Sequence, residues 1–504
     1  MICYISTSKD ITFYWEKCEC FEDGYSYRII FDDKELGRTE KTHYTVRNLL
    51  ENKKYIFLLE LVGKDGELIL SESVQCQTKS CSEKIDITKP PYCAVGDGKT
   101  LNTEKIQAAI DDCKEGECVY IPAGDFLTGA LKLHSNMELY LEKDALLHGT
   151  TNVEDYLPKI PSRFEGIEMM CYSSLINMGN LDSESDYNCK NVMIYGEGTI
   201  CGGGKKLSQN IIETESILMK DYIDTLGEKI LDFEKSYTIP GRTRPRLINI
   251  SNSQNIVIYG ITIENGPCWN VHMIYSDNII THNCVFRSEG VWNGDGWNPD
   301  SSTNCTIFNC DFYTGDDSVA VKSGKNPQGN IINRPSKYIK IFDCRCLAGH
   351  GITIGSEMAG GVEDVHIWDC DLANTFFGVE IKATKKRGGY VRKVQVNDTK
   401  VSRILMHNVP YNDDGEAAAD IPVFEDCIFR NLHLYGEAHM NGKTEDCDVI
   451  ELVGFDEPGH CIKNIKFKKI ILESNDKKRK QNISLACCEG ISIEDIYCSD
   501  KIKI

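Results

Sequence analysis

The sequence predicts an all-β protein in which a small β-sandwich precedes a long parallel β-helix. Three observations predict this class. Short β-rich segments with turn signals fill the first 80 residues. From about residue 190, a turn residue, a short apolar strand, an Asn, Asp or Gly corner and a second strand recur along the chain. The length of 504 residues exceeds one ordinary compact domain and fits two domains or an elongated repeat fold.

The first domain is predicted over residues 1–80. Segments such as "YSYRIIFDD", "THYTVRNLL" and "KKYIFLLELVGKDG" are β-rich and end at turn residues. Trp15 on an early strand, and Tyr55 after the corner "NLLENKKY", resemble the pattern of a fibronectin type III sandwich. Residues 81–92, which contain two adjacent prolines, are predicted to be the linker.

The second domain is predicted over residues 93–504. It begins with "VGDGKTLNTEKIQAAIDDC", a turn followed by a helix whose apolar face holds Ile106, Ala109 and Ile110. Residues 205–246 interrupt the strand pattern with helical periodicity. We expect them to form a partly helical insertion on one face of the β-helix.

The repeat length predicts the solenoid. Successive repeats begin at residues 255, 278, 304, 338 and 364, which are 23, 26, 34 and 26 residues apart. Repeats of this length built from short strands indicate a parallel β-helix. A large β-sandwich would instead need regular hairpin turns between consecutive strands. One cysteine recurs at the same phase of the repeat, as expected of an inward-facing stack: Cys284, Cys310, Cys344, Cys370 and Cys427.

Composition excludes several classes of partner. The formal net charge of −20 argues against nucleic acid and against an anionic membrane surface. No segment is apolar for the 18 or so residues that a membrane span needs. The 24 cysteines include no Cys-x-x-Cys pair, so no zinc site is predicted.

The N-terminal segment "MICYISTSKDITFYWEK" has no basic region followed by an apolar run, so no secretory signal is predicted. We therefore expect a cytoplasmic protein with reduced, buried thiols. If a leader preceded this segment and has been removed, we would expect a secreted protein instead.

Carboxylates and cations fall at coil spacing. In "YTGDDSVAVKSG", Asp316 and Asp317 are adjacent, so each makes the other harder to ionise. Asp295 lies 21 residues earlier, about one coil, and His350 and Lys382 lie on the two following coils. Equivalent positions on neighbouring coils are about 4.8 Å apart, so these five residues should meet on one face. Crowding keeps one carboxyl protonated while another stays ionised, which is what glycoside hydrolysis needs.

The ordered motifs "GDGKTLNTEKIQAAI", "NGDGWNPDSS", "TGDDSVAVKSG", "GHGITIGS" and "EIK" closely resemble the polygalacturonases of glycoside hydrolase family 28. The resemblance spans roughly residues 90–500. It implies a right-handed parallel β-helix that hydrolyses α-1,4-linked galacturonate with inversion, without a metal or other cofactor. The implied substrate is polygalacturonate or a pectic oligosaccharide.

The resemblance also implies roles for the five residues. Asp316 would be the general acid, and Asp295 and Asp317 would hold and deprotonate the attacking water. His350 would tune the acid and contact the sugar. Lys382 would bind the substrate carboxylate near the cleaved bond.

Two positions depart from the family pattern. Gly294 stands where the family usually has threonine, between Asn293 and the first aspartate. Glu380 replaces the arginine of the usual Arg-Ile-Lys motif. Loss of a guanidinium and gain of a carboxylate should weaken galacturonate binding there. Either Arg387 or another basic residue compensates, or that subsite holds a neutral or modified sugar.

Further substrate contacts are expected from residues near these motifs. Basic side chains would create a positive pocket despite the net charge. His272 either lines this face or makes a corner hydrogen bond, and Trp297 is either a sugar platform or a packing residue. The expected substrate-binding residues are Lys382, Asn293, Lys322, His272, Arg244, Arg387 and Glu380.

The N-terminal module and the residues of the motifs resemble those of bacterial exo-acting members of the family. The insertion at 205–246 is a candidate wall that closes one end of the groove. Three alternatives stay open. The first is a rhamnogalacturonan or other branched-pectin glycosidase, because of Glu380. The others are a calcium-dependent pectate lyase and a non-catalytic carbohydrate-binding β-helix. The sequence leaves the oligomeric state open.

Overall fold

The computed structural model describes residues 1–181, 187–233, 235, 237–473 and 482–498. The chain divides into two compact units, Met1–Lys84 with Lys114–Cys118 and Ile85–Cys113 with Val119–Ile504. No helix among the described residues is both long enough and apolar enough to cross a membrane.

The first unit contains two antiparallel sheets around their own core. Phe13 stacks on Phe57 at 3.7 Å between ring centroids, and Trp15 packs edge-on against Tyr27. The fibronectin type III assignment stays a prediction. The sheets consist of β1 (Cys3–Ser6), β2 (Ile11–Tyr14) and β5 (His43–Val46), and of β4 (Lys34–Thr39), β3 (Ser26–Phe31), β6 (Lys54–Val62) and β7 (Leu68–Gln77).

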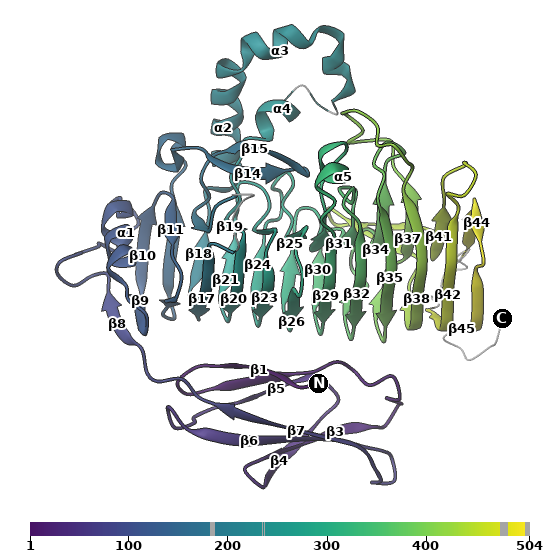
Figure 1. Cartoon of the computed structure of the whole chain (residues 1–504), viewed down its shortest axis with the longest axis horizontal. Helices are drawn as coiled ribbons and strands as arrows, with labels where there is room; N and C mark the ends of the chain where they lie inside the picture. The colour runs from purple at the N-terminus through teal and green to yellow at the C-terminus, as the bar shows by residue number, and fades with distance from the viewer. Residues whose placement is uncertain (182–186, 234, 236, 474–481, 499–504) are drawn as a thin grey trace. The chain divides into compact units, whose positions relative to one another are not determined.

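The second unit confirms the parallel β-helix. Within the described residues, each coil adds one strand to an eleven-stranded parallel sheet (Figure 1). Consecutive strands of this sheet pair in parallel, as Val319 with Ile352 and Gly351 with Gly378. The sheet contains β11 (Leu131–Leu133), β16 (Ile176–Met178), β19 (Ile248–Ser251), β22 (Val271–Ile274), β25 (Trp297–Asp300), β28 (Val319–Val321), β31 (Gly351–Ile354), β34 (Gly378–Ala383), β37 (Ile404–Asn408), β41 (Ile450–Val453) and β43 (Ile483–Ala486).

The remaining coil strands form a bent sheet of 23 strands in the described part of the chain. The first of them, β8, lies within the segment predicted to be a linker. The sheet consists of β8 (Glu83–Asp86), β9 (Glu117–Ile121), β10 (Gly124–Thr128), β12 (Met137–Leu141), β13 (Ala145–Gly149), β17 (Cys189–Gly196), β18 (Thr199–Cys201), β20 (Ser253–Tyr259), β21 (Thr262–Glu264), β23 (Asp277–His282), β24 (Val285–Arg287), β26 (Thr306–Phe308), β27 (Asp311–Tyr313), β29 (Ser336–Phe342), β30 (Arg345–Ala348), β32 (Val362–Trp368), β33 (Asp371–Leu372), β35 (Tyr390–Asn397), β36 (Lys400–Val401), β38 (Val423–Leu434), β42 (Ile462–Leu472), β44 (Cys488–Glu489) and β45 (Ser492–Cys498).

Helices extend from the coils (Figure 1), and two antiparallel hairpins are inserted between coil strands. Helix α1 (Thr103–Asp112) buries Ile106, Ala109 and Ile110, as its periodicity predicts. The insertion between β18 and β19 contains α2 (Gly204–Leu218), α3 (Lys220–Leu226), the 3-10 helix η2 (Gly227–Asp232) and α4 (Thr238–Gly241). The other additions are η1 (Val153–Tyr156), α5 (Gln328–Ile332), the hairpin β14 (Ile160–Phe164)–β15 (Ile167–Cys171) and the hairpin β39 (Glu437–Met440)–β40 (Lys443–Asp446).

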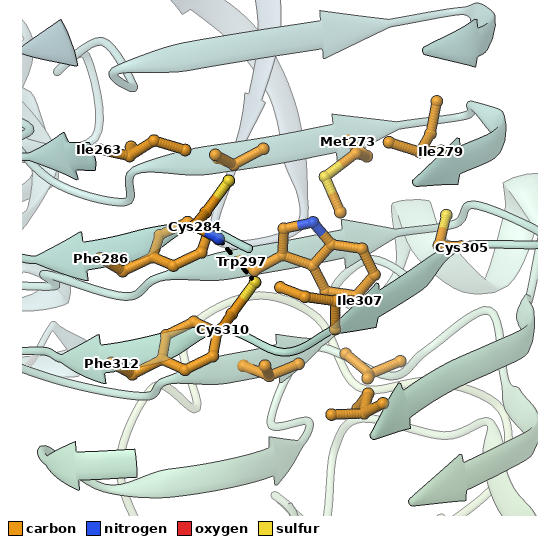
Figure 2. Packing of buried hydrophobic residues seen from close by; sticks show 14 of the residues in the cluster. Ile263, Met273, Ile279, Cys284, Phe286, Trp297, Cys305, Ile307, Cys310 and Phe312 are labelled. Carbon is orange, nitrogen blue, oxygen red and sulfur yellow. Dashed lines mark hydrogen bonds between the residues drawn. The ribbon is translucent and has the colours of Figure 1, made fainter. Parts of the chain in front are cut away.

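Equivalent side chains stack along the interior. Phe286 and Phe312 lie on neighbouring coils with ring centroids 4.7 Å apart, and the backbone N–H of Cys284 donates to the Cys310 sulfur at 3.4 Å (Figure 2). Trp297 is fully buried in the same core, so its interpretation as a sugar platform is wrong. Its indole N–H donates to the Thr281 hydroxyl at 3.0 Å. Strand alternation turns this side chain inward.

The recurring cysteines are buried thiols, as predicted. The expectation of reduced thiols throughout is wrong at one place. Cys18 and Cys20 are joined by a disulfide, whereas the five recurring cysteines of the coils are buried, free thiols. Their sulfurs fill space inside the coils in the way small hydrophobic groups do.

The stacked core predicts a large stability effect. Phe312→Ala should lower the free energy of unfolding by about 3–5 kcal/mol, because it removes a fully buried ring and leaves a cavity between coils. Urea unfolding measures this difference. Ile428→Ala, on a side chain 38% exposed, is the control and should cost under about 1 kcal/mol. A similar small cost for Phe312→Ala would contradict the stacking account.

Candidate active site

Three turns lie side by side at the start of β25, β28 and β31. They carry Asp295, the Asp316–Asp317 pair and His350. The Gly296 N–H donates to the Asp317 carbonyl, and the His350 N–H donates to the Asp316 carbonyl, both at 2.9 Å. These backbone bonds hold the turns in register, so the coil spacing brings the carboxylates and the imidazole together.

His350 contacts both adjacent aspartates. Its Nδ1 lies 2.9 Å from an Asp316 oxygen and 3.3 Å from an Asp317 oxygen. Burial alone would lower the pKa of His350, but its hydrogen bonds and the two negative charges outweigh burial and raise the pKa to about 10. The ring is therefore an imidazolium at neutral pH.

This ion pair predicts a pH-dependent stability. Because the folded-state pKa of His350 lies above its ordinary 6.5, its stabilising contribution is fully present below about pH 6.5 and is lost as pH rises through about 10. His350→Gln should therefore lower the melting temperature most below pH 6.5, and less as pH approaches 10. Thermal unfolding of both proteins across this range measures the difference. A difference that grows with pH would contradict the pairing.

Asp317 is the ionised member of the cluster. Its carboxylate accepts from the Thr353 hydroxyl at 2.8 Å. Burial would raise the pKa of Asp317, but the Lys382 ammonium and His350 lower it well below its usual range. Thr353 lies on β31, one coil after Asp317, within the motif "GHGITIGS", but no role was predicted for it.

Asp295 has the opposite environment. Burial raises the pKa of its carboxyl, Lys322 opposes this, and the charges of Asp316 and Asp317 add to it. Lys322 Nζ lies 3.5 Å from Asp295 and 3.3 Å from Glu357. The cluster thus holds a carboxyl that favours its proton beside one that is ionised.

Glu357 is a member that the motifs did not predict. Burial would raise the pKa of its carboxyl, but Lys322 and Arg387 lower it to about 2. Glu357 therefore takes up much of the charge of Lys322, whose ammonium also lies 4.6 Å from the centroid of the Trp269 ring. This sharing leaves Asp295 only weakly paired with the lysine.

The family assignment comes from comparison with known proteins. The sequence profile of the glycosyl hydrolases family 28 matches residues 114–412. The chain belongs to this family. A probable polygalacturonase from Vitis vinifera is 34% identical over 347 residues, covering 66% of this chain and 63% of that protein. An exo-poly-alpha-D-galacturonosidase from Dickeya chrysanthemi is 29% identical over 381 residues, covering 70% of this chain and 62% of that protein. The chain thus spans less than two thirds of these relatives' length.

Solved structures agree with the fold of this family 28 chain. The family 28 exopolygalacturonase of Yersinia enterocolitica superposes with a TM-score of 0.80 at 22% identity, covering 97% of this chain and 94% of that one. An exopolygalacturonase from Thermotoga maritima superposes with a TM-score of 0.69 at 26% identity, covering 84% and 93%.

Glu380, the departure from the family motif, is fully buried in this family 28 chain. One carboxylate oxygen lies 2.8 Å from Lys382 Nζ, and the other lies 2.8 Å from His407 Nε2. Burial would raise the pKa of Glu380, but Lys382 and His407 lower it. Glu380 therefore anchors Lys382 from within the wall and does not face a sugar directly.

Lys382 lies where the sequence predicted it, beside the aspartates. Burial would lower the pKa of its ammonium, but Asp317 and Glu380 raise it well above the usual range. Its Nζ lies 5.7 Å from the Phe377 centroid and 5.9 Å from the Tyr411 centroid. Tyr411 and His407 follow no motif in the sequence, because they come from the next coil and the loop after it.

Besides Glu380, three further predicted substrate-binding residues are fully buried and cannot contact a ligand directly. Arg244 is fully buried and donates to Asn293 Oδ1 at 2.8 Å and to the carbonyls of Trp292 and Gly241. It positions Asn293. We therefore correct its expected role from substrate contact to support of the turn before Asp295.

His272 and Arg387 are likewise fully buried. Burial lowers the pKa of His272 to about 4, and its ring bonds to Asp300 and to Arg246. This is the corner role that the sequence left open. Arg387 donates to Asn326 Oδ1 at 2.6 Å and to the Asn412 carbonyl at 2.8 Å. Its guanidinium is occupied by these loops, so it does not replace the arginine lost at position 380.

A cavity of about 940 Å³ adjoins the cluster at His350. The start of α2 lines one part of it, and the hairpin β39–β40 lines another. Its lining includes side chains of both charge signs, Lys205, Glu213 and Lys443, together with His439. The insertion thus forms a wall of a pocket next to the candidate catalytic residues.

Metal binding is disfavoured by the donor set. Asp316, Asp317 and His350 each place one potential ligand atom within 4.8 Å of the others. The raised pKa of His350 keeps protons on both ring nitrogens at neutral pH, and a protonated ring is no ligand. Two carboxylates then fall short of the six to eight oxygens that calcium takes. The arrangement favours proton transfer.

Proposed function

We propose that this family 28 chain is a glycoside hydrolase that cleaves α-1,4-linked galacturonate with inversion, acting from a chain end. The observation that carries the proposal is the aspartate cluster. Asp317 is held ionised by Lys382 and His350, and Asp316 lies 2.9 Å from Nδ1 of the His350 imidazolium, within one group of stacked turns. An inverting glycosidase needs a proton donor on one side of the bond and an ionised carboxylate to activate water on the other.

Each role follows from a contact. Asp316, which lies 2.9 Å from His350 Nδ1, donates a proton to the leaving oxygen. The imidazolium of His350 is the adjacent source of that proton. Asp317, kept ionised by Lys382 and His350, takes the proton of the attacking water. Asp295 holds that water by hydrogen bonding, because its raised pKa favours the neutral carboxyl. The C1–O bond breaks as the water oxygen bonds to C1.

Exo action is supported by the pocket and by the relatives. The insertion helix α2 and the hairpin β39–β40 both line the cavity next to His350, as walls that bound a short chain end would. Among the proteins compared above that are at least 25% identical to this chain, those from Dickeya chrysanthemi and Thermotoga maritima are named exo-acting. Polygalacturonate or its oligosaccharides are the proposed substrate.

A second candidate is a glycosidase of rhamnogalacturonan or other branched pectin. It is favoured by one observation, the carboxylate of Glu380 at the position where the family motif has a guanidinium. Such an enzyme would use the same aspartates and accept a different sugar beside Lys382.

Digestion of tetragalacturonate tests the proposal. We expect mass spectrometry to detect saturated monomer or dimer early in the digestion. The ultraviolet absorbance, which reports unsaturated products, should not rise. Unsaturated products would establish a lyase and contradict hydrolysis. Failure to cleave tetragalacturonate, with cleavage of rhamnogalacturonan fragments, would support the second candidate. Cleavage of neither would leave a carbohydrate-binding role.

A further inference from the structure

Three cationic side chains surround the ring of Phe377, just before β34. The His350 ring packs edge-on with its centroid 5.0 Å from that of Phe377, and Lys382 Nζ lies 5.7 Å from the same centroid. The third is Arg403, whose guanidinium carbon lies 5.2 Å away. Arg403 also lies 5.7 Å from the ring of the adjacent Phe376. No sequence motif singled out this arginine.

Arg403 occupies the next coil of the same wall. It directly precedes β37, and its carbonyl accepts from the Val379 N–H at 3.2 Å. Val379 pairs with Ile404, one residue away from the Glu380 position. The guanidinium is therefore one coil beyond the strand on which the family motif places an arginine.

The guanidinium of Arg403 has no acceptor within the described part of the chain. Its Nε is buried without a hydrogen-bond partner. The Nε of Arg387 is also buried without a partner, but the other two nitrogens of that guanidinium each donate to a protein oxygen. A donor withdrawn from water without an acceptor costs free energy. A ligand carboxylate would satisfy it, because a guanidinium matches a carboxylate in a two-pronged geometry.

The neighbouring cations already have acidic partners within the protein, so Arg403 is the one that is available to a ligand carboxylate. Lys382 is already paired with the fully buried Glu380, and Lys322 is shared by Asp295 and Glu357. His350 is paired with the aspartates. Among the cations around Phe377, Arg403 alone has no acidic partner in the described residues.

We propose that Arg403 is a specificity-determining residue that binds a uronate carboxylate of the substrate, in place of the guanidinium that Glu380 has displaced. This inference rests on the proposed function, since it assigns the acidic sugar to the same groove. It answers the question raised by the Glu380 substitution: the guanidinium is supplied from the next coil, and the subsite stays selective for acidic sugars.

Binding to an inactive background tests the proposal separately from catalysis. The probes are tetragalacturonate and its methyl ester, titrated by calorimetry into Asp316→Asn protein with and without Arg403→Gln. We expect Arg403→Gln to raise the Kd of tetragalacturonate about tenfold, the loss of one charge-assisted pair, and to leave the Kd of the ester unchanged. Arg403→Lys should recover part of the affinity.

Arg345→Gln is the matched control. It removes the same charge from a side chain 62% exposed that pairs with Asp311 on the other sheet, and it should leave both Kd values unchanged. Equal weakening of both ligands by Arg403→Gln, or no weakening of either, would overturn the proposal. If the wild-type protein cleaves no galacturonate while the expected Kd pattern appears, the proposed function fails and the role of Arg403 stands.

Discussion

Asp316→Asn should lower kcat on tetragalacturonate by roughly 10²–10⁴-fold, the contribution typical of a general acid. The amide cannot deliver the proton that the His350 contact holds at this position. The melting temperature should change little, because the side chain is 25% exposed at the edge of the turn.

Asp311→Asn is the control for this change. Asp311 is 23% exposed, pairs with Arg345 and lies on the other sheet, so the same chemical change is made away from the cluster. Its kcat should match the wild type. Wild-type turnover by Asp316→Asn, measured as reducing ends released per minute, would show that another group donates the proton.

Lys382→Met is expected to have the second large effect, on stability and activity together. It leaves the fully buried Glu380 with His407 and the Thr353 hydroxyl as its remaining polar contacts, and removing one partner of a buried ion pair costs about 3–5 kcal/mol. It also removes the leading cause of the lowered pKa of Asp317. The carboxylate that takes the proton from water then becomes harder to ionise.

The double variant Glu380→Gln/Lys382→Met separates the two effects. It removes the stranded charge, so urea unfolding should show most of the stability recovered. The activity should stay low, because Asp317 still lacks its cation. Recovery of activity together with stability would contradict a direct role of Lys382 at Asp317.

The coil spacing predicted much of this site. Asp295, the Asp316–Asp317 pair and His350 meet because stacked turns place equivalent residues one above another, and sequence spacing reports that geometry directly. The same reasoning predicted the inward stack of cysteines. The spacing does not determine the direction in which a charged side chain points from its backbone position.

The residues that escaped prediction show this limit. His407 and Arg403 come from a coil with no recognisable motif, and Glu357 follows the motif "GHGITIGS" without being part of it. Each matters through its contacts with another charge or ring. Arg387, predicted to bind the substrate, instead donates hydrogen bonds to Asn326 and to the Asn412 carbonyl. Which charged groups pair with one another depends on the conformations of their side chains, and the spacing of residues in the sequence does not determine those conformations.

We propose that the aspartate cluster hydrolyses an α-galacturonoside in a single displacement, in which water replaces the leaving group at C1. Proton NMR of the anomeric region during the first minutes of tetragalacturonate digestion tests it most directly, before mutarotation mixes the products. We predict that the new reducing end first appears in the β configuration. An α reducing end as the first product would contradict the assignment of Asp317 and Asp295 to the water.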